Sequence, residues 1–236
     1  MENYKTELLR TIPNLDVAYA ASLLGDLYGF NSPIYLPYSI SKDYKAKGFN
    51  LPQDADHASL PGFNLEVVQD EEADRMSQFG TPVFGSFTIK GGSYKIFDKR
   101  TGKLIDKTYP DFEFPVATIV DFDHSKDITL TPTSGGTGTV KEMFGFEDWK
   151  INIRGLCVYD SSRASAITAK EQQNMLIQLD NIAAALDILK GKIFLDKGIT
   201  RLVIRRLNFS PIQGKPNLIP FEIEAISDED FLIMDV

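Results

Sequence analysis

The chain has 236 residues, of which 43% are hydrophobic, 11% aromatic and 25% charged, and this composition excludes a protein that is disordered throughout. A formal net charge of -8, from 25 Lys and Arg against 33 Asp and Glu, argues against binding to nucleic acid through a basic face. The single cysteine, Cys157, excludes an internal disulfide framework and any metal site built from several cysteines. Charged residues near the N-terminus and the lack of about 20 consecutive apolar residues predict neither a signal peptide nor a membrane span.

Residues 1–80 are expected to form a helix followed by an extended arm. A short amphipathic helix is predicted between Asn14, a suitable N-cap, and Gly29, which ends it. Its apolar face comprises Val17, Ala20, Ala21, Leu24 and Tyr28. Prolines and glycines then recur up to about Gly80, which is typical of irregular structure. We expect this stretch to be an arm that packs on a partner or a partly disordered leader.

The pattern changes to strands after residue 82. Two apolar and aromatic runs, 83–90 and 93–98, are joined by the glycines at 91–92, which predicts a hairpin that turns there. A second turn is expected at 101–102, followed by a strand over 103–109.

Further strands are predicted in the second half of the chain. They cover 114–122, 128–130, 139–144, 148–159, 201–209 and 218–226. In the fourth of these, Trp149, Ile151 and Ile153 alternate with polar residues, which predicts one apolar and one polar face. Because few helices intervene, the sheet should be mostly antiparallel and should close as a small barrel or sandwich.

One long helix is predicted from Thr168. Thr168 and Glu171 have the spacing of a capping box, and Gly191 supplies a stop. The apolar stripe between them comprises Met175, Leu179, Ile182, Leu186 and Leu189. The expected fold class is therefore α+β: a mostly antiparallel barrel or sandwich at 81–236 with one long helix packed on it, preceded by the region 1–80.

Few residues suggest catalysis. The two histidines, His57 and His124, lie at no metal-ligand spacing from each other or from Cys157. Asp121 and Asp123 with His124 could bind a metal, but a solvated strand end is the preferred interpretation. Cys157 lies in an apolar run, where burial would raise its pKa and leave the thiol inert. We expect no enzyme, no metal and no cofactor.

Two further groups of residues are candidate binding sites. The segment containing Ser134, Gly135 and Gly136 is rich in glycine, but it lacks the Lys-Ser/Thr ending of a phosphate loop, so a flexible inter-strand loop is favoured. Arg201, Arg205 and Arg206 form the tightest basic group. Alternation would place Arg206 opposite the other two, which favours edge protection or salt bridges between subunits over a phosphate-binding groove.

Four segments carry a family resemblance. They are GTVKE at 138–142, EDWKINIRG at 147–155, LDKGITRLVI at 195–204 and PNLIPFEIEAISD at 216–228. In order and spacing they resemble a family of uncharacterised proteins encoded by bacterial phages and prophages, over about 108–231. The pattern is similar, more loosely, to tail-tube, distal-tail and baseplate proteins, in which a β-barrel or sandwich with one flanking helix assembles into rings.

The resemblance implies architecture and a role, and it supplies no catalytic residues. It implies a hairpin between the strand at 139–142 and the strand at 148–151, the helix from Thr168, and two last strands that complete the sheet. Our first hypothesis is a non-enzymatic structural subunit of a phage or prophage tail or baseplate, present in the host cytoplasm during assembly and then in the virion or prophage particle. Its partners would be copies of itself or other tail or baseplate subunits, with no specific nucleic acid and no membrane span.

The candidate interface residues under this hypothesis come from several parts of the chain. They are Ser134, Gly135, Gly136, Tyr35, Tyr38, Arg205, Arg206, Asp228 and Asp230. The alternative hypothesis is a β-sandwich that binds a ligand such as a carbohydrate through Tyr28, Tyr35, Tyr38 and Tyr44. A hydrolase is the third choice, because its base would have to be His57 or His124.

Overall fold

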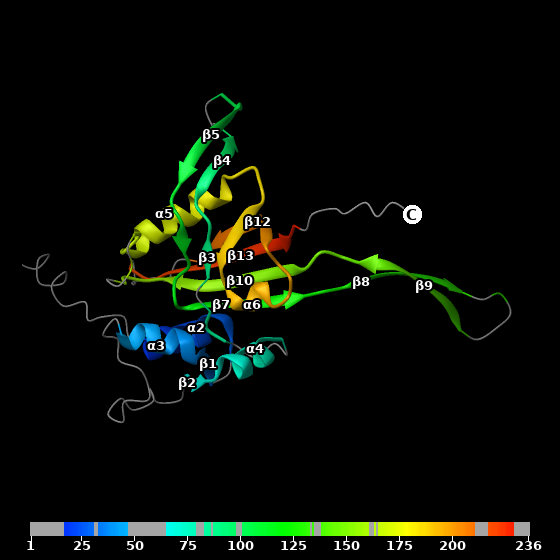
Figure 1. The fold of residues 1–236 in the computed structure, drawn as a ribbon, viewed down its shortest axis with the longest axis horizontal. Coiled ribbons are helices and arrows are strands. Elements are labelled where there is room, and N and C mark those ends of the chain that lie inside the picture. Colours follow the sequence, from blue (N-terminus) through cyan, green and yellow to red (C-terminus); the bar gives the residue numbers. More distant parts are fainter. Residues whose placement is uncertain are drawn as a thin grey trace, which may run out of the picture.

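The computed structural model describes residues 17–30, 33–46, 65–78, 83–85, 87–97, 101–132, 134, 138–160, 163, 165–210 and 217–228. Strands predominate among these residues, and the helices between them are few and short (Figure 1). No helix in these ranges is long and apolar enough to cross a membrane.

The centre of the molecule is a seven-stranded sheet with the order β6-β3-β11-β12-β13-β10-β7 (Figure 1). Its strands are β3 (Thr88–Ile89), β6 (Phe112–Glu113), β7 (Thr118–Asp123), β10 (Lys150–Cys157), β11 (Leu186–Lys190), β12 (Arg201–Phe209) and β13 (Ile219–Ser227). All of its ladders are antiparallel, which confirms the expected sheet type.

The sheet curls around its core without closing into a barrel. Just before β3, Phe84 bridges Ile119 of β7, and the Gly85 N–H donates to the Thr118 carbonyl oxygen at 3.0 Å. Within the described residues no ladder joins β6 to β7. The barrel alternative is therefore wrong, and a layered, sandwich-like fold fits.

Hydrophobic clusters cover both faces of this sheet. In β10, Ile151 and Ile153 face one cluster, together with Leu176 of the helix α5 (Ala169–Asp180). Leu156 faces the opposite cluster, together with Leu24 of the helix α2 (Val17–Tyr28). Strand alternation therefore sends successive side chains into two different cores. The predicted apolar face of β10 is confirmed, whereas its polar face is only partly exposed, because Leu156 on that side is buried with Leu24.

The helix α5 begins at the predicted capping box. The Glu171 N–H donates to Thr168 Oγ1 at 3.2 Å, and the Thr168 N–H donates to Glu171 Oε2 at 3.0 Å. Gln172, fully buried, ties α5 to the end of β10, because its side chain accepts from the Val158 N–H and donates to the Val158 carbonyl oxygen.

The predicted long helix is wrong beyond Asp180. Ile182 bridges Ile96, and the Ala183 N–H donates to the Lys95 carbonyl oxygen at 2.8 Å. These long-range backbone contacts replace the next helical hydrogen bonds. Leu186 then lies in β11, opposite Leu202. A four-residue helix, α6 (Lys192–Leu195), follows Gly191.

The region before residue 80 is more regular than predicted. The helix α2 is confirmed, but the described parts of the expected irregular arm form β1 (Ile34–Pro37), α3 (Tyr38–Ala46), β2 (Leu65–Val68) and α4 (Asp70–Gln78). β1 and β2 pair in parallel. Ile34, Leu36 and Leu65 are buried in the α2 cluster, so tertiary burial orders a stretch that turn residues had marked as a loop. Residues 47–64 of the expected arm lie outside the described residues.

Two hairpins complete the fold. They are β4 (Gly92–Phe97) with β5 (Leu104–Tyr109), and β8 (Lys126–Pro132) with β9 (Thr139–Phe146). The hairpin predicted at 91–92 is wrong, because β3 pairs with β6 and β11 instead of β4. A Cβ at Gly91 would lie 2.5 Å from the backbone of Tyr109 to Asp111, so this glycine serves a close packing contact. The turn predicted at 101–102 joins β4 to β5.

The hairpin that the resemblance implies between β9 and β10 is also wrong. β9 pairs with β8, whereas β10 lies between β7 and β13. The two last strands, β12 and β13, do complete the sheet as neighbours at its centre.

Candidate interaction surface

A two-stranded arm, residues 126–146, projects away from the sheet (Figure 1). β7 leads into β8 through His124 and Ser125, and β9 leads into β10 through residues 147–149. Because β7 pairs with β10 and β8 pairs with β9, the arm extends the β7–β10 ladder beyond the core. We call residues 126–146 the arm.

The base of the arm is fixed to the body by rings and backbone hydrogen bonds. The His124 ring stacks on Trp149, with centroids 4.1 Å apart, and on Phe146 at 5.1 Å. The Glu147 N–H donates to the Ser125 carbonyl oxygen at 3.0 Å. These contacts set the direction in which the arm leaves the sheet.

The arm exposes an unusual amount of apolar surface. Six large apolar side chains on it are 45–68% exposed: Ile128, Leu130, Val140, Met143, Phe144 and Phe146. These are six of the fourteen large exposed apolar side chains among the described residues. A contiguous apolar patch on a surface marks a site of interaction more often than a scatter of single residues does.

The register of the arm separates two faces, because directly opposite residues share a face and consecutive residues alternate. One face, which we call the lysine face, carries Lys126, Ile128, Leu130, Lys141, Met143 and Phe146. The other, which we call the acidic face, carries Asp127, Thr129, Thr131, Val140 and Glu142. The register shifts next to Ile128, where Phe144 is the extra residue of a β-bulge.

The β4–β5 hairpin is a second, smaller projection. Phe97, Leu104 and Ile105 are 45–57% exposed near its tip. In the half of the hairpin nearer its turn, Ile96 and Lys95 make backbone contacts with the segment after α5. Most of the large exposed apolar side chains of the described residues therefore lie on the two hairpins.

The face of the sheet on the α2 side is polar where α2 does not cover it. Arg154 pairs with Asp121, and its guanidinium lies 4.4 Å from the centroid of the Phe30 ring. Arg206 pairs with Glu224 at 3.4 Å. Next to these pairs is an open groove of about 330 Å³, which Arg205 also lines. The pairing of opposite charges within the chain leaves this groove close to neutral.

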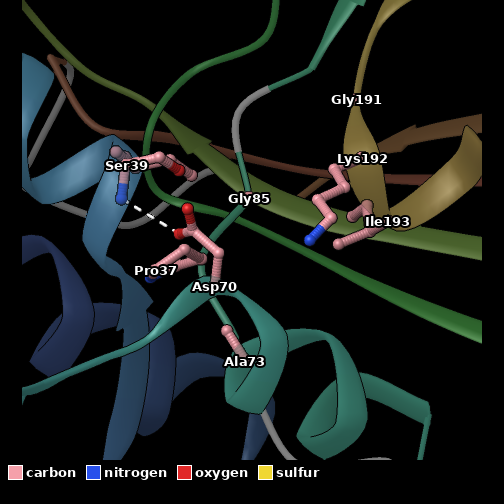
Figure 2. Close-up of a pocket in the computed structure, with 9 residues that line it drawn as sticks. Pro37, Ser39, Asp70, Ala73, Gly85, Gly191, Lys192 and Ile193 are labelled. Carbon is pink, nitrogen blue, oxygen red and sulfur yellow. Dashed lines mark hydrogen bonds between the residues drawn. The ribbon is translucent and has the colours of Figure 1, made fainter. Parts of the chain in front are cut away.

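A smaller pocket of about 130 Å³ lies between the N-terminal elements and α6 (Figure 2). Asp70 and Lys192 project toward it from opposite sides. Asp70 Oδ1 accepts the Ser39 N–H at 3.0 Å, so its carboxylate already satisfies the first turn of α3. The remaining lining is largely apolar or backbone, from residues such as Ile40 and Ile193.

The predicted interface residues do not form one surface. Ser134 lies at the tip of the arm, whereas Gly135, Gly136 and Asp230 are outside the described residues. Tyr35 is half-buried in β1, and Tyr38, 45% exposed, begins α3. Arg205 and Arg206 lie on β12, at a register shift. Asp228 follows β13 and pairs with Arg201 at 3.5 Å.

The basic group is also placed differently from the prediction. β12 lies in the interior of the sheet, between β11 and β13, so its arginines do not protect a sheet edge. Arg201 and Arg206 make ion pairs within the chain, with Asp228 and Glu224. Arg205 is exposed and lines the open groove.

The candidate metal ligands and catalytic residues of the sequence are buried or in contact with other side chains where the structure describes them. Cys157 is fully buried, and burial raises the pKa of its thiol to about 12, as predicted for a core cysteine. Asp121 pairs with Arg154, and His124 is stacked between rings. His57 lies outside the described residues. Among those described, no three His, Cys, Asp or Glu side chains gather as metal ligands would.

Of the tyrosines named in the alternative hypothesis, the three whose side chains the structure describes differ in their exposure. Tyr28 Oη donates to the Phe221 carbonyl oxygen at 2.8 Å, and burial raises the pKa of Tyr28 to about 12. Tyr35 is half-buried, and Tyr38 is exposed. The side chain of Tyr44 lies outside the described residues.

Sequence reasoning located both strands of the arm but missed their exposure. The signal available was two strands joined by a glycine-rich loop with apolar residues on both. The same pattern describes a hairpin packed in a core, and only the position of the sheet edge separates the two cases.

A comparison with known protein families finds one match, and the matched residues include the arm. A family model described as Domain of unknown function (DUF6046) matches residues 113–235, just over half of the chain. No curated protein matches. A solved chain described as "Tail of empty GTA particle computed with helical refinement, C6 symmetry" is 11% identical, with a TM-score of 0.27, over 61% of this chain and 96% of that chain. A TM-score this low does not establish a shared fold.

Proposed function

The chain belongs to the family described as Domain of unknown function (DUF6046), and we propose that it is a non-enzymatic structural subunit of a phage or prophage tail or baseplate. It acts through surfaces that it offers to copies of itself or to other subunits. It is made in the host cytoplasm and becomes part of the virion or prophage particle. The assignment to a tail or baseplate rests on the sequence resemblance at 138–228.

The observation that carries the subunit role is the arm. All its described strand residues except Gly145 are exposed, so it contributes almost nothing to the core of its own chain. An isolated two-stranded hairpin is only marginally stable in water. Fully burying one large apolar side chain contributes about 1.5–3 kcal/mol, so covering the arm with a neighbouring subunit supplies the stabilisation that the body does not.

The state of the reactive groups supports the non-enzymatic part of the proposal. The thiol of Cys157 is buried and neutral, and the His124 ring is occupied by stacking with Trp149. Among the described residues, most of the large exposed apolar side chains lie on the two projecting hairpins. Specific interfaces between subunits use such apolar elements as their centre.

A matched pair of variants tests the role of the arm. In the first, Leu130→Ser, Met143→Ser and Phe144→Ser remove apolar side chains from the arm. In the control, Ile177→Ser, Leu189→Ser and Leu195→Ser remove exposed apolar side chains elsewhere. Sedimentation velocity over a concentration series and negative-stain microscopy should show assembly of the wild type and the control, and its loss in the arm variant. Equal assembly of the arm variant and the control would argue against an interface on the arm.

The composition of particles tests the tail assignment separately. Mass spectrometry of particles purified from a host that encodes this chain should detect it at a fixed ratio to other tail components. Particles with complete tails that lack the chain would overturn the assignment, whatever the purified protein does alone.

A further inference from the structure

We propose that arms of neighbouring copies stack front to back, with the lysine face of one arm on the acidic face of the next. This inference rests on the proposed function, because it states how one copy contacts another. It names the partner as a second copy of this chain.

Four charged residues lie at two heights along the arm. Lys126 and Asp127 are consecutive in β8, and Lys141 and Glu142 are consecutive in β9. Consecutive strand residues point to opposite faces. Each lysine on one face therefore has a carboxylate at nearly the same height on the other face. None of the four forms an ion pair with another described residue.

A copy displaced along the direction perpendicular to the ribbon brings these charges together. Stacked sheets lie about 10 Å apart, a distance that long side chains bridge. In that arrangement Lys126 of one arm faces Asp127 of the next, and Lys141 faces Glu142. No sliding along the strands is needed, because the two pairs are already in register.

Apolar groups lie between the two charged positions and beside them. On the lysine face these are Ile128, Leu130 and Met143, with Phe146 beside Lys126. On the acidic face Thr129 lies across from Glu142, and Val140 with Thr131 lies beyond Glu142 toward the tip, at the height of Leu130 on the facing arm. The contact therefore combines apolar groups with two pairs of opposite charge, as specific interfaces do.

Charge also argues against pairing of like faces. The lysine face carries no carboxylate, and the acidic face carries no lysine or arginine. Two lysine faces in contact would bury four uncompensated positive charges, and two acidic faces four negative ones. Front-to-back contact is heterologous, so it generates a ring or an open stack and not a two-fold dimer.

The size of the arm agrees with repeated contacts. A two-stranded ribbon of seven to eight residues presents roughly 250 Å² on one face, whereas a stable pairwise interface buries about 800 Å² per partner. A single arm contact is too small for a stable dimer. Repetition around a ring, together with contacts between bodies, is the arrangement that such a surface fits.

Charge reversal tests the proposal on the full chain. Lys126→Glu with Lys141→Glu makes both faces acidic, and Asp127→Lys with Glu142→Lys makes both faces basic. Each double variant should weaken assembly at least tenfold in sedimentation velocity at low ionic strength. Lys103→Glu with Lys190→Glu is the matched control, because both side chains are exposed and lie outside the arm.

Mixing the two arm variants provides the decisive measurement. Each interface in the mixture again joins a basic face to an acidic face, so equal amounts of the two variants should recover assembly that neither shows alone. Failure of the mixture to assemble overturns front-to-back stacking. Undiminished assembly of both double variants also overturns it, but leaves a subunit role through other surfaces intact.

Cross-linking distinguishes this arrangement from one in which like faces meet. A Leu130→Cys chain mixed with a Thr131→Cys chain should form mixed disulfide dimers on oxidation, in excess over Leu130→Cys dimers. The native Cys157 is fully buried and does not compete. A predominance of Leu130→Cys dimers, or wild type that stays monomeric at every concentration, overturns the inference, while particle composition still decides the proposed function independently.

Discussion

At the scale of single residues, Cys157 shows how burial determines reactivity. Its thiol pKa of about 12 in the folded chain lies above the ordinary value of 9.0, because burial disfavours the thiolate. A water-soluble disulfide reagent at pH 8 should label the unfolded chain and leave the native chain unlabelled. Rapid labelling of the native chain would contradict the burial.

The same shift has a consequence for stability at alkaline pH. Folding raises the pKa of Cys157, so the neutral thiol favours the folded state. Its contribution to the free energy of unfolding is complete below pH 9.0, declines above that pH and is lost as pH rises through about 12. Chemical denaturation at pH 8 and at pH 10 should show a smaller free energy of unfolding at the higher pH, and Cys157→Ala should reduce that difference.

Gly155 is a residue at which one methyl group decides packing. A Cβ there would lie 2.5 Å from the ring of Phe221 and 2.7 Å from the Ala117 carbonyl oxygen. Overpacking of this kind costs about 1–3 kcal/mol, so Gly155→Ala should lower the midpoint of thermal unfolding clearly. Gly145→Ala is the control, because a Cβ at Gly145 meets nothing within 4 Å. Equal midpoints for the two variants would refute this account.

At the scale of elements, the start of α5 depends on its capping box. Thr168→Ala removes the side-chain oxygen that accepts the Glu171 N–H, and loss of such a cap costs about 1 kcal/mol. Thr168→Ser keeps the hydroxyl and should retain most of the stability. Urea denaturation of the three proteins measures the difference, and no loss in Thr168→Ala would show that packing alone holds the helix.

The same box predicts a dependence on acid. Hydrogen bonding to Thr168 lowers the pKa of Glu171 from the ordinary value of 4.5. The contribution of the carboxylate is therefore present above pH 4.5 and is lost as pH falls through the folded pKa. The stability gap between wild type and Glu171→Gln should narrow as pH falls below 4.5; a constant gap would exclude the charge as its cause.

The end of α5 shows why the first residue of a helix is easier to predict from sequence than the point at which the chain changes from helix to strand. The cap at Thr168 is local, so the sequence predicts it. The apolar spacing up to Leu189 fits a helix, but Ile182 and Ala183 contact β4, and Leu186 contacts β12. Strand pairing with distant segments outweighs local helix propensity there. The same competition replaces the hairpin expected at 91–92.

At the scale of the whole molecule, α2 and the sheet share one core. Leu24 is fully buried in a cluster with Phe84, Ile119 and Leu156. Leu24→Ala should lower the free energy of unfolding by about 2–5 kcal/mol, and Leu27→Ala, at a 39% exposed side chain, should lower it much less.

A shared core also predicts that the whole chain unfolds together. Far-UV circular dichroism and the fluorescence of the single tryptophan, Trp149, should therefore change at the same denaturant concentration. A shift in the first signal alone would indicate that residues 1–80 unfold as a separate domain.

The sequence alone determined the features that depend on neighbours in the chain: the helix over 17–28, the cap at Thr168, the positions of strands β7 to β10, β12 and β13, and the burial of Cys157. Strand alternation also predicted the two sides of β10. Pairing order, the end of α5, the order in the N-terminal region and the exposure of the arm were decided only by the tertiary structure. These features depend on which distant segments meet, and the same apolar alternation serves a strand in the core and a strand in the arm. The arm continues the β7–β10 ladder beyond the helices that cover the sheet. Its side chains still alternate between two faces, but no part of the described chain covers either face.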